Sequence, residues 1–102
     1  MKTNDCATML KILGDDVRLT ILHALSSGPL CVGEMNAAIG ISQNLMSHHL
    51  KLLKTAGLVT SKRVGKKVMY QRTDLVDSVI SSDQINLGCC QLVYPKDKKG
   101  KI

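Results

Sequence analysis

Residues 41–57, ISQNLMSHHLKLLKTAG, have the periodicity of an amphipathic helix whose two faces differ in chemistry. Ser42 is a suitable N-cap and Gly57 a suitable C-terminal stop, so we expect the helix to lie between them. The face expected to be buried consists of Leu45, Met46, Leu50, Leu52, Leu53 and Ala56. The opposite face consists of Gln43, Asn44, Ser47, His48, Lys51, Lys54 and Thr55. Amide, hydroxyl, imidazole and ammonium groups bind base edges and phosphates, so this face is typical of a helix that enters a nucleic-acid groove.

The basic residues are concentrated in the middle of the chain. The formal net charge is +6, and the segment from Lys51 to Arg72 holds seven of the 14 lysines and arginines. No acidic residue occurs between Glu34 and Asp74. A field of one sign is expected of a domain that binds a polyphosphate, although charge alone equally fits a basic solvated surface.

The length of 102 residues and the hydrophobic content of 44% suffice for one modest core. We expect residues 1–94 to form a single domain that needs a partner subunit to cover its remaining apolar surface. Residues 95–102 are expected to be a basic, disordered tail. The chain has no run of about 18 apolar residues and no signal-peptide pattern, so we expect a cytoplasmic protein without a membrane partner.

Three helices are predicted before the helix of residues 41–57. Apolar spacing indicates a helix over residues 4–13, a second helix that Asp15 caps and that stops at the SSGP sequence of residues 26–29, and a third over about residues 31–38. Gly40 then makes a tight turn. Two helices joined in this way form a helix-turn-helix, in which the second helix enters the major groove.

A basic β-hairpin is predicted directly after Gly57. Residues 58–61 and 67–71 alternate and are rich in β-branched side chains, and the sequence KRVGK between them contains a glycine. The predicted fold class is therefore mainly α with a small β wing, a winged helix-turn-helix. Residues 74–82 can form one more helix, and residues 85–94 fit an additional C-terminal strand better than a helix.

These residues together resemble the ArsR/SmtB family of small dimeric winged-helix repressors, with similarity over roughly residues 8–72. The resemblance rests on LKILGD at 10–15, VRL at 17–19, Ile21, Leu22, PLCVGEM at 29–35, Ser42, Gln43, SHHL at 47–50, Leu53, AGLV at 56–59, Arg63, Gly65 and Tyr70. It implies a homodimer, formed here through residues 4–13 and 74–94, that binds an imperfect inverted repeat of double-stranded DNA and is released by an inducer.

The resemblance also implies which residues contact DNA. In relatives the recognition helix contacts DNA at the positions of Gln43, Asn44, Ser47 and His48, in agreement with the polar face. The basic wing of relatives is matched by Arg63, Lys66 and Lys67. With Lys51 and Lys54 from the helix, these residues form the predicted DNA-binding set. No cofactor is required for DNA binding, and no protein partner beyond a second copy is predicted.

The cysteines are the candidate sensor residues. Cys6, Cys31, Cys89 and Cys90 lack the spacing of a disulfide framework, so free thiols, metal ligands or redox sensors are expected. Several relatives hold their inducer with a Cys-Val-Cys sequence in the segment matching residues 29–35, but here Gly33 replaces the second cysteine. One thiol cannot hold As(III) or Cd(II). Zinc sensing through histidines of the last helix is also disfavoured, because no histidine follows Gln71.

The remaining candidate is the pair Cys89 and Cys90, with Cys6 or Cys31 as a third thiol. Relatives with adjacent C-terminal cysteines bind trivalent arsenic or antimony with such a set, and the resemblance favours Cys6 because the first helix and the C-terminal segment are expected to meet. A strand over residues 85–94 would direct the two side chains to opposite faces unless Gly88 permits a bulge.

Three functions remain open from the sequence. The first is a repressor released when thiols bind As(III), Sb(III), Cd(II), Pb(II) or Hg(II). The second is the same repressor sensing oxidants or reactive sulfur species through thiol oxidation. The third, more distant, is a metal-carrying or purely structural DNA-binding protein. An enzyme is not expected, because the chain has no nucleophile-base-acid constellation and no phosphate-binding loop.

Overall fold

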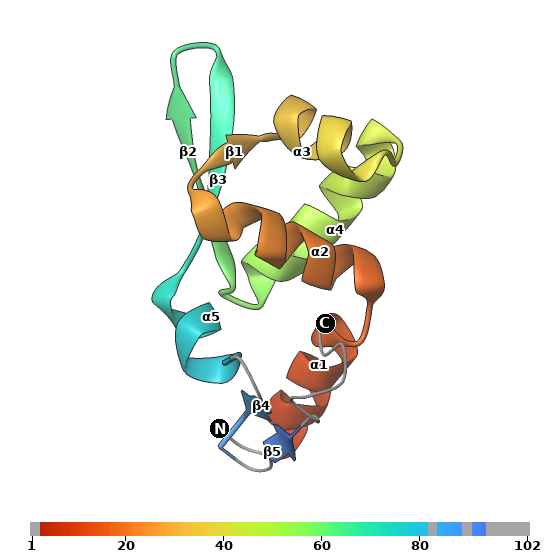
Figure 1. Cartoon of the computed structure of the whole chain (residues 1–102), viewed down its shortest axis with the longest axis vertical. Coiled ribbons are helices and arrows are strands. Elements are labelled where there is room, and N and C mark those ends of the chain that lie inside the picture. Colours follow the sequence, from red (N-terminus) through yellow and green to blue (C-terminus); the bar gives the residue numbers. More distant parts are fainter. Residues whose placement is uncertain (1–2, 82–83, 89–90, 94–102) are drawn as a thin grey trace.

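The computed structural model describes residues 3–81, 84–88 and 91–93 (Figure 1). The helices are α1 (Thr3–Leu13), α2 (Asp16–Ala24), α3 (Val32–Ile39), α4 (Gln43–Thr55) and α5 (Asp74–Val79), and a 3-10 turn, η1 (Leu25–Ser27), follows α2. The strands are β1 (Leu30–Cys31), β2 (Val59–Val64), β3 (Lys67–Arg72), β4 (Gln84–Asn86) and β5 (Gln91–Val93). This order confirms the predicted fold class, mainly α with a small β wing. None of the described helices is long and apolar enough to cross a membrane.

Side-chain capping determines where α2 and α4 begin. The Asp15 carboxylate accepts hydrogen bonds from the backbone N–H groups of Val17 and Arg18, at 2.9 and 3.2 Å. The Ser42 hydroxyl accepts one from the Leu45 N–H at 3.1 Å. Each cap satisfies N–H groups that a helix leaves unpaired in its first turn. Both caps were predicted from the sequence and are confirmed.

Gly40 makes the turn between α3 and α4. Its φ of 79° lies in the left-handed region, which glycine adopts without the steric penalty of a Cβ atom. The Gly40 N–H also donates to the carbonyl oxygen of Asn36 at 2.7 Å, which closes the last turn of α3. The helix-turn-helix therefore has the tight turn that the sequence predicted.

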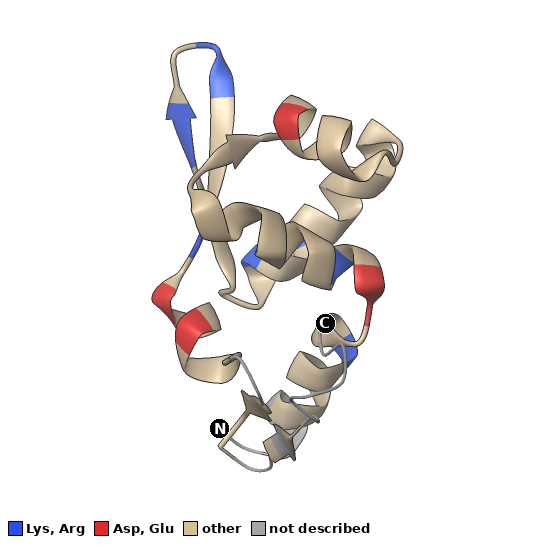
Figure 2. Ribbon diagram, in the orientation of Figure 1, with Lys and Arg blue, Asp and Glu red and all other residues tan. Residues whose placement is uncertain are grey.

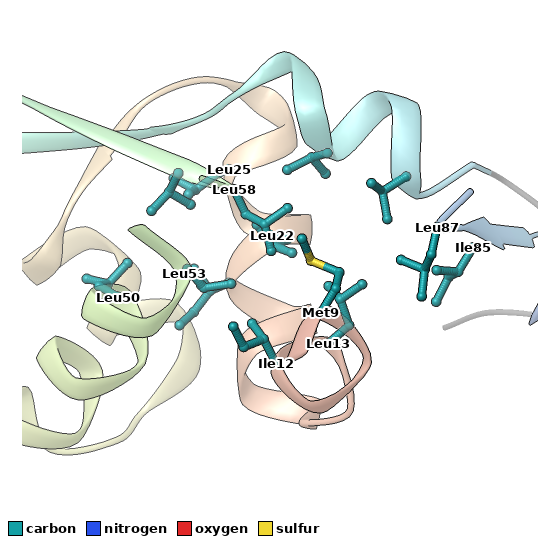
Figure 3. Packing of buried hydrophobic residues seen from close by; sticks show 14 of the residues in the cluster. Met9, Ile12, Leu13, Leu22, Leu25, Leu50, Leu53, Leu58, Ile85 and Leu87 are labelled. Carbon is teal, nitrogen blue, oxygen red and sulfur yellow. The ribbon is translucent and has the colours of Figure 1, made fainter. Parts of the chain in front are cut away.

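One hydrophobic core joins all five helices. Its fully buried residues include Ile21, Met35, Met46, Leu50, Leu53, Leu58 and Val76. Figure 3 shows Met9 and Leu13 of α1 between Leu22 of α2 and Leu87 near the C-terminus. Burying one such side chain stabilises the fold by about 1.5–3 kcal/mol. The core thus packs against the apolar face of α4 and extends to the C-terminal segment.

A three-stranded antiparallel sheet in the order β1-β3-β2 forms the wing side of the domain. In the hairpin, which we call the wing (residues 59–72), Val59 pairs with Arg72 and Val64 with Lys67. On the other side of β3, Leu30 pairs with Tyr70 and Cys31 with Met69. β1 was not predicted, because two residues carry no periodicity and the strand exists only through its pairing with β3.

The C-terminal segment differs from the prediction in two respects. α5 ends at Val79 rather than at residue 82, and Ile80 forms a β-bridge with Ile85. β4 and β5 pair as an antiparallel hairpin, so a strand rather than a helix is confirmed but one continuous strand over 85–94 is wrong. The chain turns at Gly88, whose φ is 87° and whose N–H donates to the Asn86 side chain at 2.9 Å. Residues 82–83, 89–90 and 94–102 lie outside the described residues.

Candidate nucleic-acid interface

The polar face of α4 is directed to solvent over its whole length. The side chains of Gln43, Asn44, Ser47, His48, Lys51 and Lys54 are exposed. Met46, His49, Leu50 and Leu53 on the opposite face are buried in the core. Leu45 was expected to widen the buried stripe but is 42% exposed, because it lies in the first turn at the open end of the helix. The two-faced helix predicted from the sequence is thus present with a narrower apolar stripe.

The wing carries the second group of predicted DNA-binding residues. Arg63, Lys66 and Lys67 are exposed around the hairpin turn that contains Gly65. Figure 2 shows basic residues at the projecting end of the wing, whereas acidic residues lie at the start of α2, in the first turn of α3 and in α5. α4 and the wing are therefore the two basic elements on this side of the domain, and the structure keeps them apart from most acidic groups.

Glu34 is an acidic residue whose pKa is affected by the charge of Lys67 on the wing. Its carboxylate accepts a hydrogen bond from the Cys31 N–H at 2.9 Å, at the start of α3. This bond, a further one from the Cys31 side chain and the positive charge of Lys67 lower the pKa of Glu34 below its ordinary value. Glu34 is thus ionised at neutral pH and caps α3.

Two basic side chains, Lys54 and Arg72, hold the wing in place through contacts that the sequence did not reveal. The Lys54 ammonium donates to the Ser61 hydroxyl at 2.8 Å, which joins the last turn of α4 to β2. The Arg72 guanidinium donates to the Leu22 carbonyl oxygen at 3.2 Å and forms an ion pair with Asp77 at 2.6 Å. Leu22 and Arg72 are 50 residues apart, so no local pattern could have indicated the second contact.

Of the candidate sensor cysteines, the two that the structure describes, Cys6 and Cys31, lie in different parts of the fold. Cys6 is 3% exposed on α1, and its sulfur lies 3.7 Å from the carbonyl oxygen of Leu87. Cys6 is disulfide-bonded, whereas Cys31 is a half-buried free thiol at the start of α3. In Figure 1, α1 lies beside β4 and β5, and β1 lies at the other end of the domain. Cys89 and Cys90 are outside the described residues.

No group of three or more potential metal ligands occurs among the described residues. The Cys6 contact nevertheless places a sulfur atom beside the chain that leads into residues 89–90. Cys6, one of the two candidates for a third thiol, thus lies in contact with Leu87, two residues before Cys89 in the sequence.

A helix-turn-helix with an exposed polar recognition helix and an adjoining basic wing defines a winged helix-turn-helix DNA-binding domain. The family model described as "Bacterial regulatory protein, arsR family" matches residues 15–61. The regulator NmtR of Mycobacterium tuberculosis is 35% identical over 88 residues, which cover 80% of this chain and 73% of the relative. The arsenical resistance operon repressor of Staphylococcus xylosus is 42% identical over 71 residues, which cover 70% and 68%.

A solved structure supports the same assignment. The homodimeric winged helix-turn-helix DNA-binding domain of Mb0332 from Mycobacterium bovis superposes with a TM-score of 0.64 at 32% identity. The match covers 68% of this chain and 64% of that domain. The chain belongs to the ArsR family of transcriptional regulators and is a DNA-binding repressor of the ArsR/SmtB type, not an enzyme.

Proposed function

We propose that the chain acts in the cytoplasm as a homodimer on an imperfect inverted repeat, with α4 of each protomer in the major groove. The observation that carries this proposal is the exposed polar face of α4 beside a basic wing. Gln43, Asn44, Ser47 and His48 would contact base edges near the N-terminus of α4. Lys51 and Lys54 of α4 and Arg63, Lys66 and Lys67 of the wing would lie near phosphates, which set affinity rather than sequence preference.

The proposed dimer interface combines α1 with residues 74–94. Both elements carry large apolar side chains that the single chain leaves in solvent: Leu10 of α1 is 36% exposed and Val93 of β5 is 69% exposed. A second copy would remove such groups from water. The related Mb0332 domain is described as homodimeric. Two protomers would then present two α4 helices to half-sites about one helical turn apart.

The proposed inducer is a thiophilic metal or metalloid ion held by Cys89, Cys90 and Cys6. Support comes from the Cys6 sulfur, which is buried against Leu87, two residues before Cys89. Thiolates are suitable donors for As(III), Sb(III), Cd(II), Pb(II) and Hg(II), which are soft ions. The relative from Staphylococcus xylosus is named as an arsenical resistance repressor. Binding at this point would act on α1 and the C-terminal segment, the two parts of the proposed dimer interface.

A second candidate inducer is an oxidant. The observation that favours it is the disulfide bond of Cys6, because disulfides in a reducing compartment are usually transient and redox-sensing. Two thiols would lose two protons and two electrons to form the disulfide, and an oxidant such as hydrogen peroxide would be reduced to water. Both candidate inducers act on the same thiols: the ion would bind them, whereas the oxidant would convert them to a disulfide.

One titration separates these alternatives. Reduced protein is bound to a fluorescent duplex with an inverted repeat, and As(III), Sb(III), Cd(II), Pb(II), Hg(II), Zn(II) and an organic polysulfide are added separately while anisotropy is followed. Release by a thiophilic ion but not by the polysulfide supports the metal sensor. Release by the polysulfide alone supports the redox sensor, and release by neither excludes the tested ions and the polysulfide as inducers. A random duplex of equal length is the control for non-specific binding.

A further inference from the structure

The hydrogen bond between Lys54 and Ser61 connects the two elements that are proposed to hold DNA. Its length is 2.8 Å, and it runs from an ammonium on the last turn of α4 to a hydroxyl on β2. Lys54 was predicted to contact phosphate, yet one donor of its ammonium is directed to the wing. Lys54 therefore has a protein partner on the wing, Ser61.

The position of Ser61 on β2 is suited to this contact. Along β2, Val59 is buried and Ser61 half-buried, whereas Thr60 and Lys62 are exposed. Side chains of a strand alternate between faces, so Ser61 lies on the side of the sheet that faces the helices and Lys62 on the outer side. Ser61 pairs with Tyr70 of β3, which is also partly buried against the core.

β2 is held by its pairing with β3 and by the buried Val59, and Ser61 adds a direct contact with α4. β2 is the edge strand of the order β1-β3-β2, so its second edge pairs with no strand of that sheet. At the base of β2, the Leu58 N–H donates to the Leu53 carbonyl oxygen at 2.9 Å, and the Gly57 N–H donates to the Lys54 carbonyl oxygen at 3.0 Å. These two bonds fix the point at which the chain leaves α4. Ser61 lies three residues after Leu58, so its contact with Lys54 resists rotation of β2 about that base.

We infer that Lys54 is a positioning residue that sets the angle of the wing relative to α4 through Ser61, so that both elements reach the same duplex. This inference rests on the proposed DNA-binding function and assigns one residue of its predicted contact set to a different role. A phosphate-binding lysine and a positioning lysine both raise DNA affinity. They differ in salt dependence, because only the former releases a counterion when DNA binds.

The test compares Lys54→Met, Ser61→Ala and the double variant with the wild-type protein on an inverted-repeat duplex at several salt concentrations. Each single variant is expected to weaken binding by about threefold to tenfold, the range for loss of one hydrogen bond. The slope of log K against log salt should stay at the wild-type value. The double variant should bind no more weakly than the weaker single variant, because the two changes remove one interaction.

Three controls complete the design. Lys66→Met, at the wing turn, should reduce the salt slope by about 0.9, the contribution of one phosphate contact. Ser61→Thr, which keeps the hydroxyl, should retain wild-type affinity. Thermal unfolding of each variant identifies any loss of fold, and in that case Ser61→Thr, which keeps the hydroxyl, provides the comparison.

Two results would overturn the inference. A reduced salt slope in Lys54→Met together with normal binding by Ser61→Ala would show a phosphate contact instead. Additive effects in the double variant would show that the two side chains act separately. Neither result affects the proposed function, which fails only if the wild-type protein does not prefer the inverted repeat to random duplex.

Discussion

The sulfur atom of Cys6 lies 3.7 Å from the carbonyl oxygen of Leu87, so the first helix and the C-terminal segment meet at a cysteine. The contact is buried, since Cys6 is 3% and Leu87 2% exposed. A reaction at this sulfur would disturb two elements at once, α1 and the chain after α5. This is the physical basis for linking thiol chemistry to the proposed dimer interface.

Replacement of Cys6 should separate sensing from DNA binding. Cys6→Ala keeps a small apolar side chain in the core and removes the sulfur, so DNA affinity should stay within about twofold while release by the inducer is lost. The matched control is Cys31→Ala, which removes the free thiol at the start of α3 and should respond normally. Both are measured by anisotropy with the wild-type inducer. A normal response of Cys6→Ala would remove Cys6 from the sensor.

Base-reading and phosphate-binding side chains should behave differently. Gln43→Ala or Ser47→Ala should lower discrimination between operator and random DNA by about 1–3 kcal/mol per base contact. Lys66→Ala or Lys67→Ala should weaken binding to both DNAs alike and flatten the salt dependence. Parallel titrations of the two duplexes give both quantities. Equal effects of the two groups of variants on both DNAs would refute the assignment.

Arg72 is expected to stabilise the fold mainly through Leu22. Arg72→Met should lower the free energy of unfolding by about 1.5–3 kcal/mol, because it removes a charged donor from a partly buried carbonyl oxygen. Asp77→Asn is the matched control and should cost less than about 1 kcal/mol, since the Asp77 side chain is 74% exposed. Urea denaturation measures both. A larger loss for Asp77→Asn would show that the ion pair is the stronger contact.

Asp15 should make stability depend on pH in the acidic range. Burial raises the pKa of its carboxyl, but the hydrogen bonds from Arg18 and Val17 and the charge of Arg18 outweigh burial and hold the pKa below its ordinary value. A group with a lowered folded pKa stabilises the protein above its unfolded pKa. That contribution is lost as the pH falls from the ordinary value through the folded one.

The variant Asp15→Ser tests this prediction. Its hydroxyl can still cap α2, so stability at neutral pH should fall by less than about 1 kcal/mol. The acid-dependent part of the unfolding free energy should shrink, because serine does not titrate. Urea denaturation at pH 7 and at a series of values below 4 gives the comparison. An unchanged acid dependence in Asp15→Ser would assign the effect to other carboxyls.

Much of the local structure followed from the sequence because its causes are local. Asp15, Ser42 and Gly40 act within a few residues of their own positions, so capping and turn chemistry predicted where α2 and α4 begin and where α3 ends. The two faces of α4 follow from its 3.6-residue period, although Leu45 is exposed and Leu52 and Ala56 are only half-buried. The basic hairpin was likewise predicted from alternation and a glycine.

The tertiary structure decided what depends on distant parts of the chain. β1 exists through its pairing with β3, and the segment over residues 84–93 turns at Gly88 into a hairpin rather than continuing as one strand. The contacts between Arg72 and Leu22 and between Cys6 and Leu87 join residues 50 and 81 positions apart. Periodicity and capping carry no information about such contacts, because they arise only when the helices have packed around a common core.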